Sequence, residues 1–190
     1  MKKLILTLAI GTFLYGCNHS HEHTHDAPKS TEELYDYDVE AKITELGITL
    51  TEPSPPVANY VNAVRTGNLV FMAGKGPSKP EGGYITGKLG TDLTIEEGYE
   101  AGKLAAIAQL SSLKAEIGDL NKVVRIVKVL GMVNCTPDFT SQPEVINGFS
   151  DTMVEVFGDR AKHARAAVGM GSLPRNIAVE VEMIVEVQDQ

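Results

Sequence analysis

The alternation of apolar and polar residues near the C-terminal end predicts two adjacent β-strands. Over residues 177–187 one face carries an unbroken apolar series: Ile177, Val179, Val181, Met183, Val185 and Val187. Over residues 164–170 the apolar series is Ala164, Ala166, Val168 and Met170. Because successive side chains of a strand point to opposite faces, we expect each series to form a core face. If both core faces pack on the same helices, Arg165 lies on the other side of the sheet, with Glu180 and Glu182.

Two further stretches repeat their apolar residues at the helical period and predict two helices. Each opens with a capping box, in which a hydroxyl and a carboxylate accept hydrogen bonds from the free amides of the first turn. The first box is Thr94-Ile95-Glu96-Glu97, and the apolar stripe that follows is Ala106, Leu110, Leu113 and Ile117, ended by Gly118. Gly98 and Gly102 near its start indicate close approach of another backbone. The second box is Ser141-Gln142-Pro143-Glu144, and its stripe is Ile146, Phe149, Met153, Val156 and Phe157, ended by Gly158.

The remaining apolar segments complete a mixed fold. Residues 59–64 and 69–73 flank the turn signal Arg65-Thr66-Gly67-Asn68 and predict a hairpin, and the β-branched run 123–133 predicts a central strand. The order is then strand, strand, helix, strand, helix, strand, strand. Strands and helices do not strictly alternate in this order. It therefore favours an α+β domain over residues 39–190, with an open mixed sheet covered by two helices on one face.

Residues 1–17 have the pattern of an export signal. Lys2 and Lys3 precede an apolar run over residues 4–14, which is shorter than the roughly 20 residues needed to span a bilayer. The run ends in Leu14-Tyr15-Gly16-Cys17, which resembles a bacterial lipobox, whose cysteine becomes a lipidated N-terminus. We expect a protein exported to the bacterial cell envelope and anchored there by lipid at Cys17, on the periplasmic or outer-membrane face. A secretory signal cleaved nearby is the alternative.

Residues 18–38 are polar and acidic and contain almost no aliphatic side chain. Such a segment buries too little apolar surface to offset its chain entropy, so we expect a flexible tether. Its histidines, His19, His21, His23 and His25, could hold Zn²⁺, Cu²⁺ or Ni²⁺. Ligands on a flexible chain lack the supporting groups that orient a metal site, so a solubilising spacer is favoured over a metal-capturing tail, and no metal site is expected.

Charge and cysteine content narrow the classes of function. A formal charge of −8 argues against a nucleic-acid partner, because phosphate binding needs clustered Lys and Arg. Once Cys17 is lipidated, Cys135 is the one cysteine left, which excludes an intrachain disulfide. Cys135 ends an apolar run and is expected to be a small buried side chain rather than a nucleophile. No catalytic triad supports Cys135 as a nucleophile, because His163 is the one histidine outside the tail.

Arg165 is the candidate functional residue that alternation singles out. It begins a strand of small residues, in which Ala167 and Gly169 leave open space beside the guanidinium. One interpretation is a cross-strand salt bridge with Glu180 or Glu182 on a solvated face, worth about 0–1 kcal/mol. The other is a site for a small anion, because a guanidinium binds a carboxylate through two parallel hydrogen bonds and a lysine does not. Alternation alone leaves both open.

The chain resembles the RidA/YjgF family of reactive-intermediate deaminases. The resemblance runs from about residue 56 to residue 187 and is carried by three segments: PVANYVNAVRTGNLVFMAGKGP, EIGDLNKVVRIVKVL and HARAAVGMGSLPRNIAVEVEMIVEV. It implies a chorismate-mutase-like fold and a homotrimer with three ligand clefts between neighbouring subunits. The partly apolar second face of the sheet would then be an interface.

The resemblance also implies an activity and the residues that perform it. Members of the family hydrolyse small carboxylate-bearing enamines and imines to 2-keto acids and ammonia, and no cofactor is implied. Carried over by position, Arg165 binds the substrate carboxylate with help from the Gly74 amide. Glu180 orients or activates the attacking water, and Tyr60 lines the cleft.

Two departures from the family pattern favour an alternative. Ala73 and Ala167 stand where members often carry Ser and Cys. The second hypothesis is therefore a noncatalytic module that binds a small carboxylate in the same cleft. The two hypotheses differ in whether the bound compound is hydrolysed.

Overall fold

The computed structural model of the chain describes residues 33–53 and 55–189. The export signal with Cys17, the histidines of the tail and most of the expected tether lie outside the described residues. Within the described residues, no helix is both long and apolar enough to cross a membrane.

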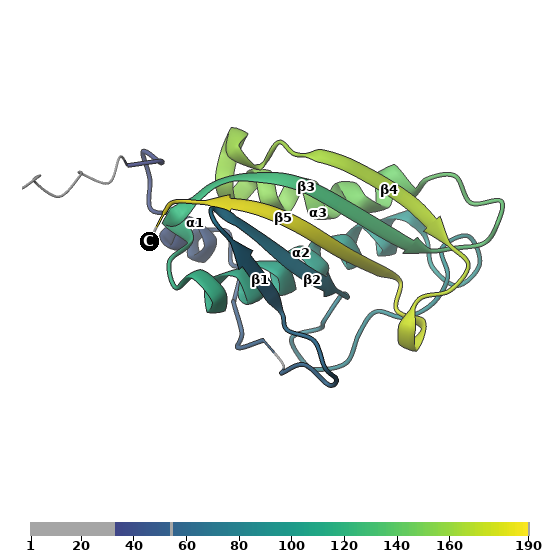
Figure 1. The fold of residues 1–190 in the computed structure, drawn as a ribbon. Helices are drawn as coiled ribbons and strands as arrows, with labels where there is room; N and C mark the ends of the chain where they lie inside the picture. The colour runs from purple at the N-terminus through teal and green to yellow at the C-terminus, as the bar shows by residue number, and fades with distance from the viewer. Residues whose placement is uncertain (1–32, 54, 190) are drawn as a thin grey trace, which may run out of the picture. The chain divides into compact units, whose positions relative to one another are not determined.

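A five-stranded sheet forms one layer of the domain (Figure 1). Its strands are β1 (Ala63–Thr66), β2 (Leu69–Lys75), β3 (Val123–Asn134), β4 (Ala164–Met170) and β5 (Val179–Val187). Their order across the sheet is β1-β2-β5-β3-β4, and the pairing is antiparallel except between β3 and β4. The predicted central strand and two C-terminal strands are confirmed, and β1 and β4 form the edges. The predicted hairpin is present, but its first strand includes Arg65 and Thr66, which were expected in the turn.

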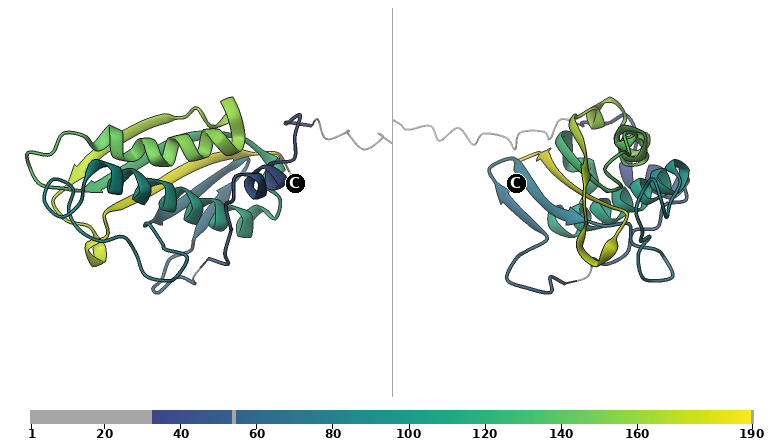
Figure 2. Two further views of the ribbon diagram at one scale, coloured as in Figure 1. Left: turned by 180° about the vertical axis from the view of Figure 1, so that it is seen from behind. Right: turned by 90° about the vertical axis from the view of Figure 1, so that its right-hand side faces the viewer.

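Two long helices, α2 (Ile95–Ile117) and α3 (Gln142–Phe157), lie side by side over one face of the sheet (Figure 2). The core lies between these helices and the sheet, and β5 turns its predicted apolar face toward that core. Its largest fully buried side chains include Phe149, Phe157, Leu110, Leu113, Ile126 and Met183. The α+β architecture with one helix-covered face is confirmed.

The two predicted helix starts differ in their caps. The Thr94 hydroxyl accepts a hydrogen bond from the Glu97 amide at 3.2 Å, and the Glu97 carboxylate accepts one from the Thr94 amide at 2.8 Å. Ser141 precedes α3 but makes no side-chain capping bond, so the second predicted capping box is wrong. Its ψ of 33° is outside the extended conformation that directs a capping hydroxyl toward the free amides.

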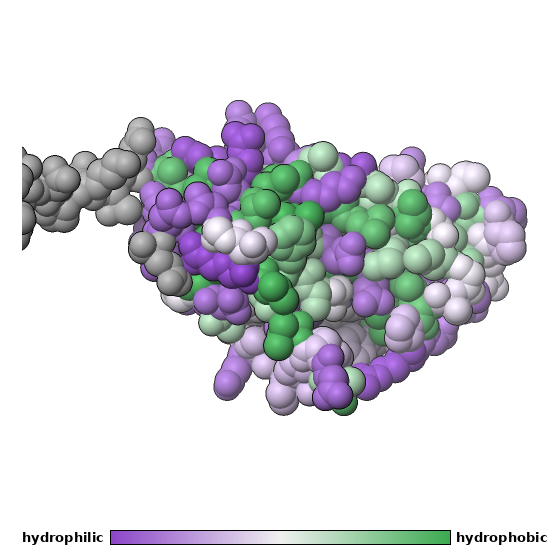
Figure 3. Space-filling model, viewed as in Figure 1, coloured by the Kyte–Doolittle hydropathy of each residue, from purple (hydrophilic) through white to green (hydrophobic). Residues whose placement is uncertain are grey.

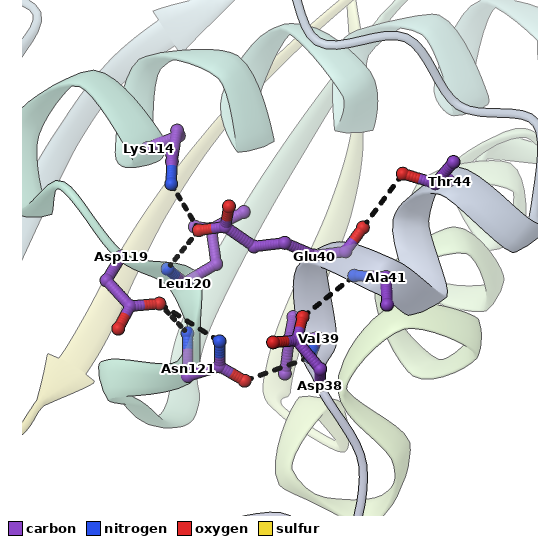
Figure 4. Close-up of polar contacts among 9 residues, drawn as sticks. All are labelled: Asp38, Val39, Glu40, Ala41, Thr44, Lys114, Asp119, Leu120 and Asn121. Carbon is purple, nitrogen blue, oxygen red and sulfur yellow. Dashed lines mark hydrogen bonds and ion pairs between the residues drawn. The ribbon is translucent and has the colours of Figure 1, made fainter.

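A short helix that the hydrophobic pattern did not predict, α1 (Val39–Glu45), docks against the C-terminal end of α2 (Figure 4). Glu40 forms an ion pair with Lys114 and accepts a hydrogen bond from the Leu120 amide at 3.2 Å. The Asn121 side chain accepts a hydrogen bond from the first amide of α1 at 2.9 Å. Polar contacts therefore supply much of what holds this helix.

The folded part of the chain also begins before residue 39. The Tyr35 hydroxyl donates to the Val123 carbonyl at 2.6 Å, and the Tyr37 hydroxyl donates to the Val156 carbonyl at 2.9 Å. The Arg160 guanidinium lies 5.4 Å from the centre of the Tyr35 ring. Residues 33–38 thus pack on the domain, because Leu34 and two tyrosines provide apolar surface within a segment that is otherwise acidic.

The two helix starts allow a matched test of the capping assignment. We expect Thr94→Ala to lower the free energy of unfolding by about 1 kcal/mol, because the Glu97 amide loses its acceptor. Ser141→Ala is the control and is expected to change it by less than about 0.5 kcal/mol, since no capping bond is lost. Urea denaturation followed by circular dichroism measures both, and equal losses in the two variants would contradict the assignment.

Candidate functional site

The register of β4 places Arg165 on the helix-covered face of the sheet. Arg165 pairs with Val129 of β3, and Val129 pairs in turn with Met183 of β5. Val129 and Met183 are core residues. Directly paired residues share a face, so the expectation that Arg165 shares a face with Glu180 and Glu182 is wrong.

The error arises because the second face of the sheet is apolar as well. Through their pairing partners on β3, Ala166 and Val168 share a face with Glu182 and Glu180. The more apolar side of β4 therefore points away from the helices. Alternation correctly separates the two sets of residues of this strand, but it does not tell which set the helices cover.

Arg165 is held by the neighbouring helix rather than by an acidic residue. Its Nη1 atom donates to Oδ1 of Asn147 and to Oγ of Ser150, both at 3.0 Å and both on α3. A guanidinium carries five N–H groups, of which two belong to Nη1. Within residues 33–53 and 55–189, Nε and Nη2 of Arg165 have no hydrogen-bond or ion-pair partner. The edge of the guanidinium that suits a carboxylate is thus unoccupied by the described part of its own chain.

A histidine continues this network behind the arginine. Oγ of Ser150 lies 3.1 Å from Nε2 of His163, and Nδ1 of His163 lies 2.6 Å from the Ala161 carbonyl oxygen. A carbonyl oxygen only accepts, so Nδ1 carries the ring proton and Nε2 accepts from the Ser150 hydroxyl. Burial lowers the pKa of His163, and the charge of Arg165 lowers it further. The imidazole is therefore neutral at neutral pH.

Gly74 and Glu180 are brought together on neighbouring strands. A Cβ atom at position 74 would overlap the Glu180 carboxylate, so only glycine lets this carboxylate rest on the β2 backbone. The contact lies where the pairing of β2 with β5 shifts, between Met72 and Lys75. Burial raises the pKa of Glu180, and the nearby charge of Glu182 raises it further. The half-buried carboxyl is thus a stronger base than an exposed glutamate.

Tyr60 lies ahead of β1 with 52% of its surface exposed. Two residues on, the Asn62 carbonyl accepts a hydrogen bond from the Ala73 amide at 3.0 Å, which places this segment beside the end of β2 that carries Gly74. The Asn62 side chain also accepts from Nζ of Lys75 at 2.7 Å. Tyr60 and the Gly74–Glu180 contact therefore lie toward the same end of the hairpin.

One chain does not bring Arg165 and Glu180 into one cleft. The strands that carry them are separated by β3, a span of about 10 Å, and their paired positions on β3 are offset by about another 10 Å along the strand. They also face opposite sides of the sheet. The predicted site residues thus form two groups: Arg165 under α3, and Gly74 with Glu180 across the sheet.

The open face of the sheet carries exposed apolar side chains that gather over its middle (Figure 3). Val64, Phe71 and Val168 are 56%, 42% and 38% exposed. A hollow of about 470 Å³ on this face is lined mainly by apolar residues, with Lys128 and Glu182 among them. An exposed apolar area of this kind is typical of an interaction surface.

Sequence reasoning missed the two residues that contact Arg165. Asn147 and Ser150 lie three apart, so they share one face of α3. Two polar residues beside an apolar stripe are common on any surface helix, and only the fold shows that they face Arg165. Cys135, in contrast, is 5% exposed, which confirms the prediction of a small buried side chain.

Comparison with known proteins gives the family and the fold of this chain. The model of the YjgF/chorismate mutase-like family, whose description also includes endoribonuclease, matches residues 40–187. Protein TCP17 of Trypanosoma cruzi is 41% identical over 152 residues, which is 80% of this chain and 95% of TCP17. The 2-iminobutanoate/2-iminopropanoate deaminase of Escherichia coli is 27% identical over 135 residues, 70% of this chain and 92% of the deaminase.

Among solved structures, Atu1372 of Agrobacterium tumefaciens, a protein of unknown function, superposes with a TM-score of 0.74 at 40% identity, covering 79% of this chain and 92% of Atu1372. The chain therefore belongs to the YjgF/RidA-like family and has its chorismate-mutase-like fold.

The raised pKa of Glu180 predicts a dependence of stability on pH. The folded protein holds the Glu180 proton more tightly than the unfolded chain does, so ionisation of this group costs stability as the pH rises past its ordinary value of 4.5. We expect Glu180→Gln to be more stable than the wild type at pH 7 and to lose this advantage below pH ~4. Thermal melting across this range measures the difference. Glu155→Gln on the exposed side of α3 is the control, and an advantage that persists at low pH would contradict the assignment.

Proposed function

We propose that this protein hydrolyses small carboxylate-bearing imines, and the enamines that tautomerise to them, to 2-keto acids and ammonia. Family membership supports this proposal, as does the similarity to the E. coli protein named 2-iminobutanoate/2-iminopropanoate deaminase. The reaction needs a cation for the carboxylate and a base for the water. Arg165 and Glu180 are residues of those two types.

The observation that carries the proposal is that, among the described residues, the charge of Arg165 is not neutralised and one edge of its guanidinium is unoccupied. A half-buried guanidinium is costly without a partner, and here Asn147 and Ser150 occupy Nη1 without neutralising the charge. The Nε and Nη2 edge is left for two parallel hydrogen bonds to a carboxylate. In this proposal the Gly74 amide binds the same carboxylate and Tyr60 lines the cleft.

The cleft we propose lies between two copies of the chain in a homotrimer. Because Arg165 and Glu180 lie on opposite faces of the sheet, a second copy is needed to place a base near the guanidinium. The exposed apolar face with Val64, Phe71 and Val168 is the surface we assign to this assembly. Each cleft then combines Arg165 from one subunit with Gly74 and Glu180 from its neighbour.

The chemistry follows from these assignments. The Glu180 carboxylate accepts a proton from water as the water oxygen bonds to the carbon of the protonated imine, giving a carbinolamine. Glu180 then returns the proton to nitrogen, and the C–N bond breaks with its electron pair on nitrogen. The hydroxyl proton passes to the released ammonia as the C=O bond forms, which gives a 2-keto acid and ammonium. The raised pKa of Glu180 suits this exchange, because a base works best when its pKa approaches the working pH.

The second candidate is a noncatalytic module that holds a small carboxylate in the same cleft. Ala73 and Ala167, which stand where members of the family often carry Ser and Cys, favour it. For either function we propose the cell envelope as the location, with lipid at Cys17 as the anchor, on the strength of the N-terminal sequence pattern.

Hydrolysis can be tested with imino acids generated enzymatically in the assay. We expect the wild type to accelerate keto-acid release and Arg165→Ala to reduce kcat/KM by at least about 100-fold, because a charge-assisted pair is lost. Arg125→Ala is the matched control, since Arg125 is an exposed arginine paired with Glu186. If the wild type releases keto acid no faster than buffer but 2-oxobutanoate still raises its melting temperature, the noncatalytic module is the correct function.

Subunit mixing tests whether the cleft is shared. Arg165→Ala and Glu180→Gln trimers are each expected to be inactive, and unfolding and refolding an equal mixture should restore activity. After random assembly about a quarter of all clefts combine an intact Arg165 with an intact Glu180 from the neighbouring subunit, so about a quarter of the wild-type activity is expected. Wild-type protein carried through the same refolding is the control. A mixture that stays inactive beside an active control would show that the cleft is not shared.

A further inference from the structure

The polar network behind Arg165 has no role in the chemistry described above, although it lies at the proposed carboxylate site. It runs from the Ala161 carbonyl through His163 and Ser150 to Nη1 of Arg165. We propose that Ser150 and His163 are positioning residues that set the direction of the Arg165 guanidinium for carboxylate binding. This inference rests on the proposed function, because it concerns how the same carboxylate is held.

The directions of the hydrogen bonds form a single chain. Nδ1 of His163 donates to the Ala161 carbonyl, which leaves Nε2 as an acceptor. The hydroxyl of Ser150 has one proton and donates it to Nε2 at 3.1 Å. Its lone pairs then face Nη1 of Arg165, which donates to them at 3.0 Å. The proton on Nδ1 of His163 therefore leaves Ser150 to donate to Nε2 and to accept from Arg165.

His163 matters because the hydroxyl of a serine within a helix has a competing hydrogen-bond acceptor in the helix backbone. Serine within a helix commonly donates to the carbonyl four residues earlier, as Ser111 and Ser112 do in α2. Nε2 of His163 draws the Ser150 hydroxyl away from that geometry and toward β4. The imidazole itself is held at its other nitrogen by Ala161 and packs edge-on against the Phe149 ring, with 6.4 Å between ring centres.

The result is a guanidinium held from one side only. Asn147 and Ser150 take the two protons of Nη1, so the plane of the group is fixed by α3. The three remaining N–H groups on Nε and Nη2 are presented together, in the arrangement that matches both oxygens of a carboxylate. A long arginine side chain that is already fixed loses less freedom when it binds a ligand.

The test is the affinity of the purified full-length protein for 2-oxobutanoate, measured by calorimetry. We expect Ser150→Ala and His163→Asn each to weaken binding about three- to tenfold, the effect of one hydrogen bond. Nδ2 of Asn at position 163 can still donate to Ala161, but the shorter side chain places no acceptor where Nε2 of His163 lies. Ser150→Thr keeps the hydroxyl and should bind as the wild type does, and Ser112→Ala on α2 is the matched control.

A double-variant comparison separates positioning from a general loss of structure. If Ser150 acts through the guanidinium, Ser150→Ala should cost no further affinity in an Arg165→Lys background, whereas a structural defect would add to it. In hydrolysis, Ser150→Ala should raise KM several-fold more than it lowers kcat. Unchanged affinity in both Ser150→Ala and His163→Asn, or losses that add fully in the Lys background, would overturn the proposal.

A measurement without ligand keeps this proposal distinct from the proposed function. Nitrogen NMR of the wild type should show His163 protonated at Nδ1 and separate Nη1 and Nη2 signals for Arg165, because rotation of a held guanidinium is slow. The Nη signals should merge in Ser150→Ala. Merged signals in the wild type would refute the positioning role even if hydrolysis is found. Absence of hydrolysis with separate signals and intact binding would instead refute only the proposed reaction.

Discussion

The close approach of α2 and α3 is the constraint on which the rest of the structure depends. A Cβ atom at Gly102 would meet the Val145 carbonyl oxygen, and one at Gly148 would overlap the Tyr99 carbonyl oxygen. The two backbones can therefore touch only because both positions are glycine. This contact fixes how α3 is rotated over the sheet, and Asn147 and Ser150, on either side of Gly148 in the sequence, are thereby turned toward β4.

Much of this arrangement was predictable from the sequence, because it depends on local patterns. The helical period correctly predicted the two long helices, and Gly102 correctly predicted a close backbone contact. Gly98 instead packs against the side chains of Leu89 and Val145. The short helix α1 was missed because it buries only Val39 and Ile43, too few for a period to be visible. Besides these two buried side chains, polar contacts with residues distant in sequence hold it.

The site was less predictable, for a physical reason that Arg165 illustrates. Alternation divides a strand into two faces, but both faces of β4 carry small or apolar residues, and the covered face is decided by pairing with β3. The partners of Arg165 lie 15 and 18 residues away on a different element. The contact between Gly74 and Glu180 likewise depends on a shift in register between two strands, which no pattern within either strand reveals.

The N-terminal contacts also have a mechanical consequence. The chain enters the domain beside the helices, where Tyr35, Tyr37 and Arg160 hold it, rather than over the open face of the sheet (Figures 1 and 2). A pulling force applied ahead of residue 33 would be borne first by these contacts and by the ion pair of Glu40 with Lys114. Because Tyr35 bonds the first residue of β3, such a force would pass to one end of that strand and not across the open face that we assign to assembly.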